Sequence, residues 1–136
     1  MTKEEKELLF RDICGRIPYG TKAKYDANGV SEDVVISLAT VKILQAIPTD
    51  REFPITIKPY LRPMSSMTHA EREEWFNVKF EATMALLRNC EEGSNIPNAS
   101  PDIVSLNWLY ERHFDCNNLI EQGLALEASE GMYKLE

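Results

Sequence analysis

The serines and the histidine near residue 66 are the closest approach in this sequence to a nucleophile with its base. Ser65 and Ser66 carry hydroxyls, and His69 is near enough along the chain to accept a proton from one of them. Neither serine lies in a Gly-x-Ser-x-Gly turn, which exposes the nucleophile of many hydrolases. Both fall where a helix is expected to begin, so we favour capping and hydrogen bonding over catalysis.

A second group, His113 and Cys116, has a spacing that metal ions accept, with Cys14 and Cys90 as distant further ligands. A structural zinc site usually shows two close ligand pairs, and this sequence has one at most. We therefore favour buried thiols, and a histidine at the negative end of a helix dipole, over a metal site. We predict no metal site.

Acidic pairs and glycine-rich loops give no stronger indication of catalysis. The carboxylate pairs fall on expected solvent faces or loops, where solvated charge is more common than acid–base chemistry. They are Glu4 with Glu5, Glu73 with Glu74, and Glu91 with Glu92. The six glycines are not clustered, and neither Gly-x-x-x-x-Gly-Lys nor Gly-x-Gly-x-x-Gly occurs. We predict no cofactor and no catalytic residue.

We call residues 57–68 the strap, because the chain changes there from strand-like to helix-like sequence. Pro59 and Pro63 lack a backbone donor and push the preceding residues toward extended dihedrals. In an extended strap the two prolines lie on one side. The residues on the other side are Lys58, Tyr60 and Arg62.

Two cations and an aromatic ring in one line can bind an anion, stack on a base or anchor a protein contact. The alternative is a connector whose cations are balanced by nearby acids, and we favour that alternative. Those acids are Glu71, Glu73 and Glu74. If the strap does bind a partner, we expect the contact residues to be Lys58, Tyr60, Arg62, Ser65 and Ser66.

The segment before the strap predicts one helix and a small sheet. A Thr2–Glu5 capping box begins a helix that runs through about residue 16. Residues 22–25 read as an edge strand at best, and residues 26–29 as a tight turn. Residues 34–47 are apolar and β-branched, which favours two strands, although a helix competes on length. Residues 53–57 can form another strand.

Residues 69–89 give the strongest helix prediction, with a Thr68–Glu71 capping box at the start. One apolar stripe would consist of Phe76, Phe80, Met84 and Leu87, and a second of Trp75, Val78, Ala82, Ala85 and Leu86. A helix with two apolar stripes should be covered on two sides. We therefore expect this helix to be the centre of the core.

After a loop at residues 90–99, Ser100, Pro101 and Asp102 predict the start of a helix over 101–114. Residues 117–122 predict a further helical turn that Gly123 closes. The apolar tail at 124–126 is expected to dock in an extended form.

Length, charge and cysteine content restrict the class of protein. The 136 residues suit a single domain, 1–136, with its own core. A net charge of −7 opposes binding to phosphate backbones, so nucleic acid is an unfavoured partner. Three irregularly spaced cysteines fit reduced thiols. No apolar run suits a signal peptide or a membrane span, so we expect a cytoplasmic protein without membrane contact.

Three segments carry a resemblance to a known group of proteins. They are residues 12–20 (DICGRIPYG), residues 57–68 (IKPYLRPMSSMT), and residues 107–115 (NWLYERHFD) continuing to residues 123–128 (GLALEA). They resemble a family of small uncharacterised proteins from anaerobic gut bacteria and their phages or other mobile elements. The resemblance implies a phage-related or mobile-element accessory protein and carries no catalytic residue.

Together these features predict an α+β fold in which an antiparallel sheet of three or four strands packs against three main helices. The leading functional hypothesis is a non-enzymatic module that binds an unknown protein partner through the strap and the adjacent helix surface. The alternative is a nucleic-acid-associated accessory protein that uses Lys58, Tyr60 and Arg62. A small enzyme built around His69 or His113 is a third hypothesis, and it would need a deep pocket at either residue.

Overall fold

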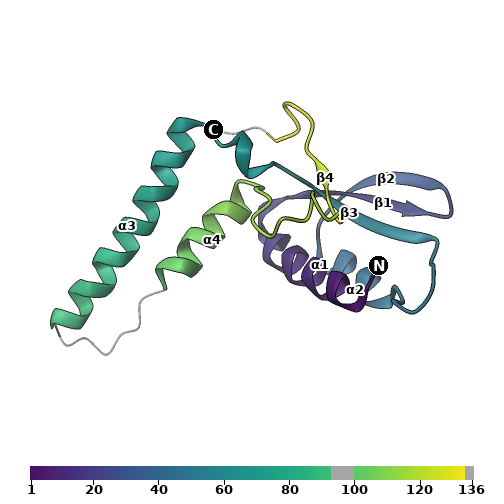
Figure 1. Cartoon of the computed structure of the whole chain (residues 1–136), viewed down its shortest axis with the longest axis horizontal. Coiled ribbons are helices and arrows are strands. Elements are labelled where there is room, and N and C mark those ends of the chain that lie inside the picture. Colours follow the sequence, from purple (N-terminus) through teal and green to yellow (C-terminus); the bar gives the residue numbers. More distant parts are fainter. Residues whose placement is uncertain (93–99, 134–136) are drawn as a thin grey trace.

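The computed structural model describes residues 1–92 and 100–133, which form an α+β fold, as expected (Figure 1). The helices are α1 (Lys3–Arg16), α2 (Leu38–Ala46), α3 (His69–Glu92) and α4 (Pro101–Glu111), with short 3-10 turns η1 (Ile17–Tyr19) and η2 (Met64–Ser66). The strands are β1 (Lys22–Ala27), β2 (Val30–Val35), β3 (Ile55–Leu61) and β4 (Leu126–Glu127). None of the helices in the described residues is long and apolar enough to cross a bilayer.

The sheet is mixed, with strand order β2-β1-β3-β4. β1 pairs antiparallel with both β2 and β3, whereas β4 runs parallel to the end of β3. The prediction that residues 22–25 form an edge strand is therefore wrong, because β1 lies between two partners. The predicted turn is confirmed, with Asn28 and Gly29 at φ values of 52° and 83°.

The prediction of two strands over residues 34–47 is also wrong. Val34 and Val35 end β2, and the chain then forms α2. A capping box joins Ser37 and Thr40, and the hydroxyl of Thr40 accepts a hydrogen bond from the backbone of Ser37 at 3.1 Å. The cap and the burial of one helical face outweigh the strand preference of β-branched residues. That face consists of Thr40, Val41 and Leu44.

The main core lies between the sheet and the helices α1 and α2. Leu9 and Ile13 of α1, Leu44 of α2, and Ile57 and Leu61 of β3 belong to one buried cluster. The predicted Thr2–Glu5 capping box is present at the start of α1. The core therefore depends on α1 and α2 and does not include α3.

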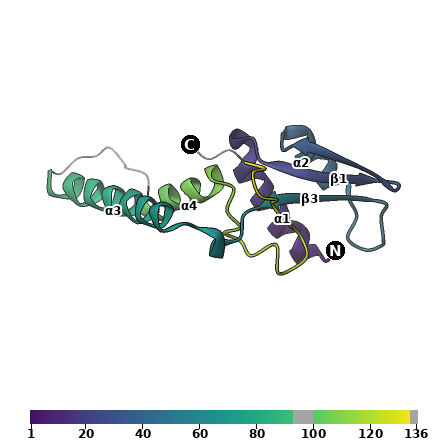
Figure 2. The same cartoon turned by 90° about the horizontal axis from the view of Figure 1, so that it is seen from above.

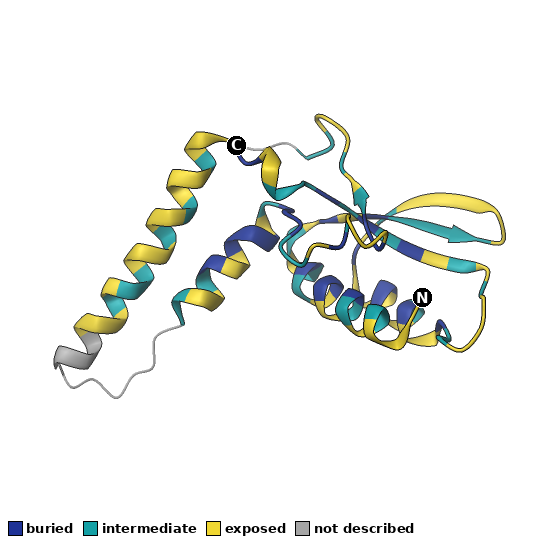
Figure 3. Cartoon of the chain, in the orientation of Figure 1, coloured by how far each residue is buried: buried dark blue, intermediate teal, exposed yellow. Residues whose placement is uncertain are grey.

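Helix α3 pairs with α4, and the two project from the sheet as an arm (Figures 1 and 2). The prediction that α3 is the centre of the core is wrong. Its Trp75 and Val78 pack on a second cluster, but the other apolar stripe has no neighbour among the described residues. We call that stripe the outer face of α3, and its exposed residues colour the helix mainly yellow in Figure 3. It consists of Phe76, Phe80, Met84 and Leu87.

The connections mostly follow the predictions. The Thr68–Glu71 capping box forms, and Ser100 caps α4, which ends at Glu111 instead of residue 114. The predicted helical turn at 117–122 is wrong, because this segment forms non-helical turns; Gly123, at φ 75°, follows it. The tail is extended, as expected: Leu124 and Ala125 are buried, and Leu126 then pairs with Tyr60. This pairing attaches the tail to the sheet.

Candidate functional site

The strap is extended through Leu61, where its side chains alternate as predicted, and Met64–Ser66 then form the 3-10 turn η2. Ile57, Pro59 and Leu61 are buried, whereas Lys58 and Tyr60 are only partly covered on the opposite side. Pro59 fits inside β3 because of the hydrogen-bonding register. Asn28 N donates to Pro54 O, and hydrogen-bonded positions alternate along an antiparallel pair, so Ile55, Ile57 and Pro59 direct their backbone groups away from β1. The missing N–H of Pro59 therefore costs no bond to β1.

Arg62 forms an ion pair with Glu71. Its guanidinium contacts both carboxylate oxygens of Glu71, at 2.9 and 2.8 Å, and each of the two side chains is 12% exposed. The same guanidinium lies over the ring of Phe114, 4.1 Å from its centroid. The hydrogen bond from Arg62, together with the backbone donor of Thr68, lowers the pKa of Glu71 to about 2. The predicted balance between a strap cation and Glu71 is therefore present.

The other predicted strap residues do not converge on one point. Tyr60 donates to Asp33 Oδ1 at 2.9 Å, and its carbonyl accepts from the hydroxyl of Tyr133 at 2.7 Å. Lys58 lies opposite Lys24 in the sheet. Ser65 and Ser66 are exposed in η2, and the hydroxyl of Ser66 donates to the carbonyl of Pro63. Lys58 and Tyr60 thus lie on the sheet, Arg62 lies in an internal ion pair, and Ser65 and Ser66 lie in η2.

Ser66 and His69 have separate partners. His69 is exposed, and its Nε2 lies 3.1 Å from Glu73 Oε1, one turn along α3. No hydrogen bond between His69 and either strap serine occurs in the described residues. Capping of this helix is provided by Thr68 and Glu71, as predicted.

A buried polar network that the sequence analysis missed lies between α1 and the segment after α4. Asp12 and Arg16 are fully buried and form a bidentate ion pair at 2.8 and 2.9 Å. Arg16 also donates to the carbonyl of Phe114, and Asn117 donates to both Asp12 and the hydroxyl of Tyr110. The four-residue spacing of Asp12 and Arg16 was the only available signal, and it is equally common on exposed helix faces.

Gly15 permits the close approach of α4 to this network. A Cβ at Gly15 would lie 2.7 Å from the ring of Tyr110, a separation that side chains do not tolerate. The ring in turn lies over the guanidinium of Arg16, 4.8 Å from its centroid. Residues 12–20 and 107–115 therefore meet at this joint and have a packing role there.

His113 is buried at a position of positive φ, 65°, directly after α4. Its Nδ1 lies 2.8 Å from the hydroxyl of Thr21, and its ring stacks on Tyr133 with centroids 3.8 Å apart. Burial, with the charges of Arg16 and Arg62 nearby, lowers its pKa to about 4. At neutral pH the imidazole is therefore uncharged, and it does not compensate the helix dipole as a cation.

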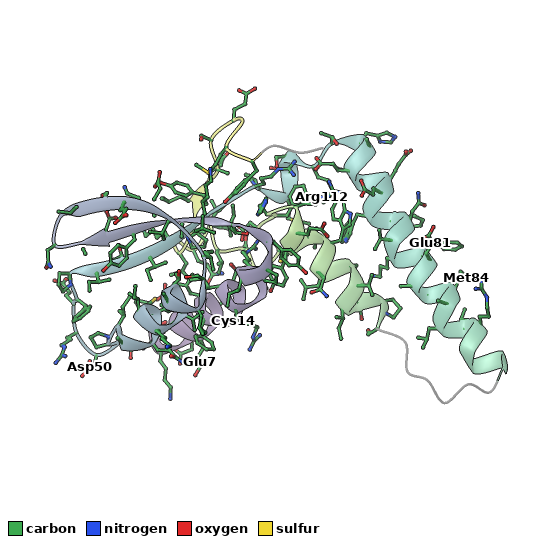
Figure 4. The ribbon with its side chains drawn as sticks, turned by 180° about the vertical axis from the view of Figure 1, so that it is seen from behind. Glu7, Cys14, Asp50, Glu81, Met84 and Arg112 are labelled. Atoms are coloured by element: carbon green, nitrogen blue, oxygen red, sulfur yellow. The ribbon has the colours of Figure 1, made fainter. Side chains whose placement is uncertain are left out.

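The two cysteines whose side chains are described, Cys14 and Cys116, are free thiols. Cys14 is exposed on α1, at the position labelled in Figure 4. The Sγ of Cys116 lies 3.9 Å from Nη2 of Arg16. Burial raises the pKa of the Cys116 thiol to about 11. The side chain of Cys90 is outside the described residues. Within the described parts of the chain, no three His, Cys, Asp or Glu side chains gather closely enough to hold a metal ion.

The outer face of α3 is the most exposed apolar surface on a described helix. Phe76 is 68% exposed, Phe80 55%, Leu87 52% and Met84 43%. Figure 4 shows Met84 projecting on the side of α3 that is turned away from α4. The opposite side of α3 is tied to α4, since Glu74 bonds Arg112 at 2.7 Å and Trp108 at 3.2 Å. The bonds to α4 are therefore made from the side of α3 opposite the exposed outer face.

A second feature is a hollow of about 420 Å³ beside β3, which we call the edge hollow. The charged residues that line it are two of each sign, Glu5, Arg51, Glu52 and Lys58. The volume is within the range of ligand and peptide pockets. Its apolar lining includes Leu9, Leu44, Ile47, Phe53, Ile57 and Leu124.

The outer face and the edge hollow are the two candidate contact surfaces, and the strap residues join neither as a group. Comparisons with protein-family models, with curated proteins and with solved structures each found no match, so the two surfaces are interpreted from their own chemistry.

Proposed function

We propose that this protein is a non-enzymatic, self-associating interaction module, and that the outer face of α3 is its contact surface. The exposure of Phe76 and Phe80 on a helix anchored from its other side carries the proposal. The resemblance of three segments to proteins of phages and mobile elements supports an accessory role in such an element. The strap connects the sheet to this arm and is not the contact surface in this proposal.

Leaving the outer face in water is energetically unfavourable. The four side chains expose on the order of 400 Å² of apolar surface, which is comparable to the largest apolar patch of a typical monomeric protein, and such patches are often functional. Covering either phenylalanine would contribute roughly 2–3 kcal/mol. Burial of this face against a partner therefore offers a substantial driving force.

The order of residues along the outer face suits a second copy of the chain. Phe80 is at its centre, with Phe76 four residues before it and Met84 four residues after it. In an antiparallel pair of α3 helices related by a twofold axis at Phe80, Phe76 of one copy meets Met84 of the other. Sulfur–aromatic contacts of this kind are favourable.

The charges at the ends of the face are mixed in an antiparallel pair. Glu73 lies seven residues before Phe80 and is level with Leu87 of the other copy, whereas Arg88 lies eight residues after Phe80 and is level with Arg72. All four residues are exposed, so Arg88 of one copy would have both Glu73 and Arg72 of the other beside it. The 24-residue helix is about 36 Å long, which is sufficient for a contact of several turns.

Sedimentation velocity of the full chain between 1 and 500 μM tests this proposal. We expect a concentration-dependent dimer, and we expect Phe80→Glu to remain monomeric throughout with an unchanged thermal transition. Asn77→Glu is the matched control, because it adds the same charge to the same helix at an exposed site beside the face. A wild-type chain that stays monomeric at 500 μM, or a Phe80→Glu chain that dimerises normally, would overturn the proposal.

A further inference from the structure

The free part of the β3 edge is the starting point for a second contact site. β4 accompanies only Tyr60 and Leu61 at the carboxyl end of β3 (Figure 1). Residues 55–59 have β1 on one side, and no strand pairs with them on the other side within residues 1–92 and 100–133. The sheet therefore presents an open edge about five residues, or roughly 16 Å, long.

The backbone groups at this edge belong to identifiable residues. Because Pro54 bonds toward β1 and antiparallel strands alternate, Ile55 and Ile57 direct their N–H and C=O groups outward. No hydrogen bond to either pair of groups occurs among the described residues. Ile57 belongs to the main core and is 3% exposed, whereas Ile55 is half-buried.

The edge hollow lies along this same segment. Ile55, Thr56, Ile57 and Lys58 all line it, together with Leu124 from the turn that leads into β4. Its floor includes Leu9 and Leu44, which belong to the main core. Apolar side chains of an added strand would therefore rest on the core while its backbone bonded Ile55 and Ile57.

Two lysines lie side by side on the solvent side of the sheet, and one of them, Lys24, also faces Asp33 of β2. Lys58 lies directly opposite Lys24, and like charges in that position repel each other. Neither lysine is within 4.0 Å of a carboxylate in the described part of the chain. An acidic side chain beside Lys58 would relieve this repulsion, because opposite charges on adjacent strands attract.

We propose that the open edge of β3 binds an extended segment of a partner protein by strand addition, and that apolar and acidic residues alternate in that segment. The apolar side chains enter the edge hollow and the acidic ones lie beside Lys58. The added strand continues the position that β4 occupies farther along β3. This site is distinct from the outer face of α3, so the failure of one proposal leaves the other standing.

The binding test uses the full chain and a pool of labelled hexapeptides in which Val, Ile, Leu or Phe alternates with Asp or Glu. We expect saturable binding by fluorescence anisotropy and at least tenfold slower amide exchange at Ile55 and Ile57. The same pool methylated at alternate backbone nitrogens keeps every side chain and should bind at least tenfold more weakly. Absence of binding, or equal binding of the methylated pool, would overturn strand addition.

Variants of the protein separate backbone pairing from simple filling of the hollow. Ile55→Pro removes one outward N–H and should weaken binding at least tenfold, whereas Ile55→Val keeps that donor and should change binding less than twofold. Lys58→Glu should bind the acidic pool at least fivefold more weakly than the wild type does. It should bind a pool with Lys in place of the acidic residues more tightly than the acidic pool. Phe80→Glu should bind the acidic pool normally. If Ile55→Pro does not fold, unchanged binding by Lys58→Glu would still contradict the proposal.

Discussion

Two regions of the protein differ in which side chains they bury. The body consists of the sheet with α1 and α2, and the arm consists of α3 and α4. The body buries even a charged pair, Asp12 with Arg16, and gives both side chains further hydrogen-bond partners, although Nη1 of Arg16 has none among the described residues. The arm leaves Phe76 and Phe80 in water. Apolar content alone therefore does not place a helix in the core; the number of neighbours that pack on it decides.

The largest expected effect comes from breaking the charged pair in the body. Arg16→Met should lower the free energy of unfolding by about 3–5 kcal/mol, because it leaves Asp12 buried without its cation. Urea denaturation followed by circular dichroism measures this change. The double variant Asp12→Leu, Arg16→Met should recover much of the loss. A loss below 1 kcal/mol in the single variant would mean that the pair is not buried as described.

Truncating one apolar residue in each region sharpens the comparison directly. Ile13→Ala in the body should cost about 2–5 kcal/mol, because Ile13 is fully buried in the main core. Phe80→Ala in the arm should cost less than about 0.5 kcal/mol at a concentration where the chain is monomeric. Urea denaturation at 1 μM measures both. Similar costs for the two variants would contradict the difference between body and arm.

The pH dependence of stability tests the joint between body and arm through His113. Its folded pKa of about 4 is below the ordinary value of 6.5, so the unfolded chain binds the proton first as pH falls. Stability from this residue should be fully present above pH 6.5 and decrease between 6.5 and 4, by on the order of 2–3 kcal/mol. The free energy of unfolding, measured by urea denaturation at several pH values across this range, should change less with pH for His113→Gln than for the wild type. An equally steep decrease in that variant would assign the effect to other groups.

Local signals predicted much of the fold and part of the candidate surfaces. Thr2, Thr68 and Ser100 begin their helices as predicted, and Asn28 with Gly29 forms the turn. These features depend on residues three or four positions apart, so a sequence contains them completely. The prediction for residues 34–47 was wrong because burial of one face of α2 against the core outweighed intrinsic strand preference.

The sequence by itself determined the α+β class, the caps, the extended strap and the docking tail. Only the tertiary structure decided which apolar stripe of α3 is covered, that Asp12 and Arg16 are buried, and that β4 ends beside Tyr60 and leaves the edge at Ile57 open. The first group of features arises from neighbours along the chain. The second depends on contacts between residues far apart in sequence, and a periodic apolar pattern shows that a face can be buried without showing what buries it.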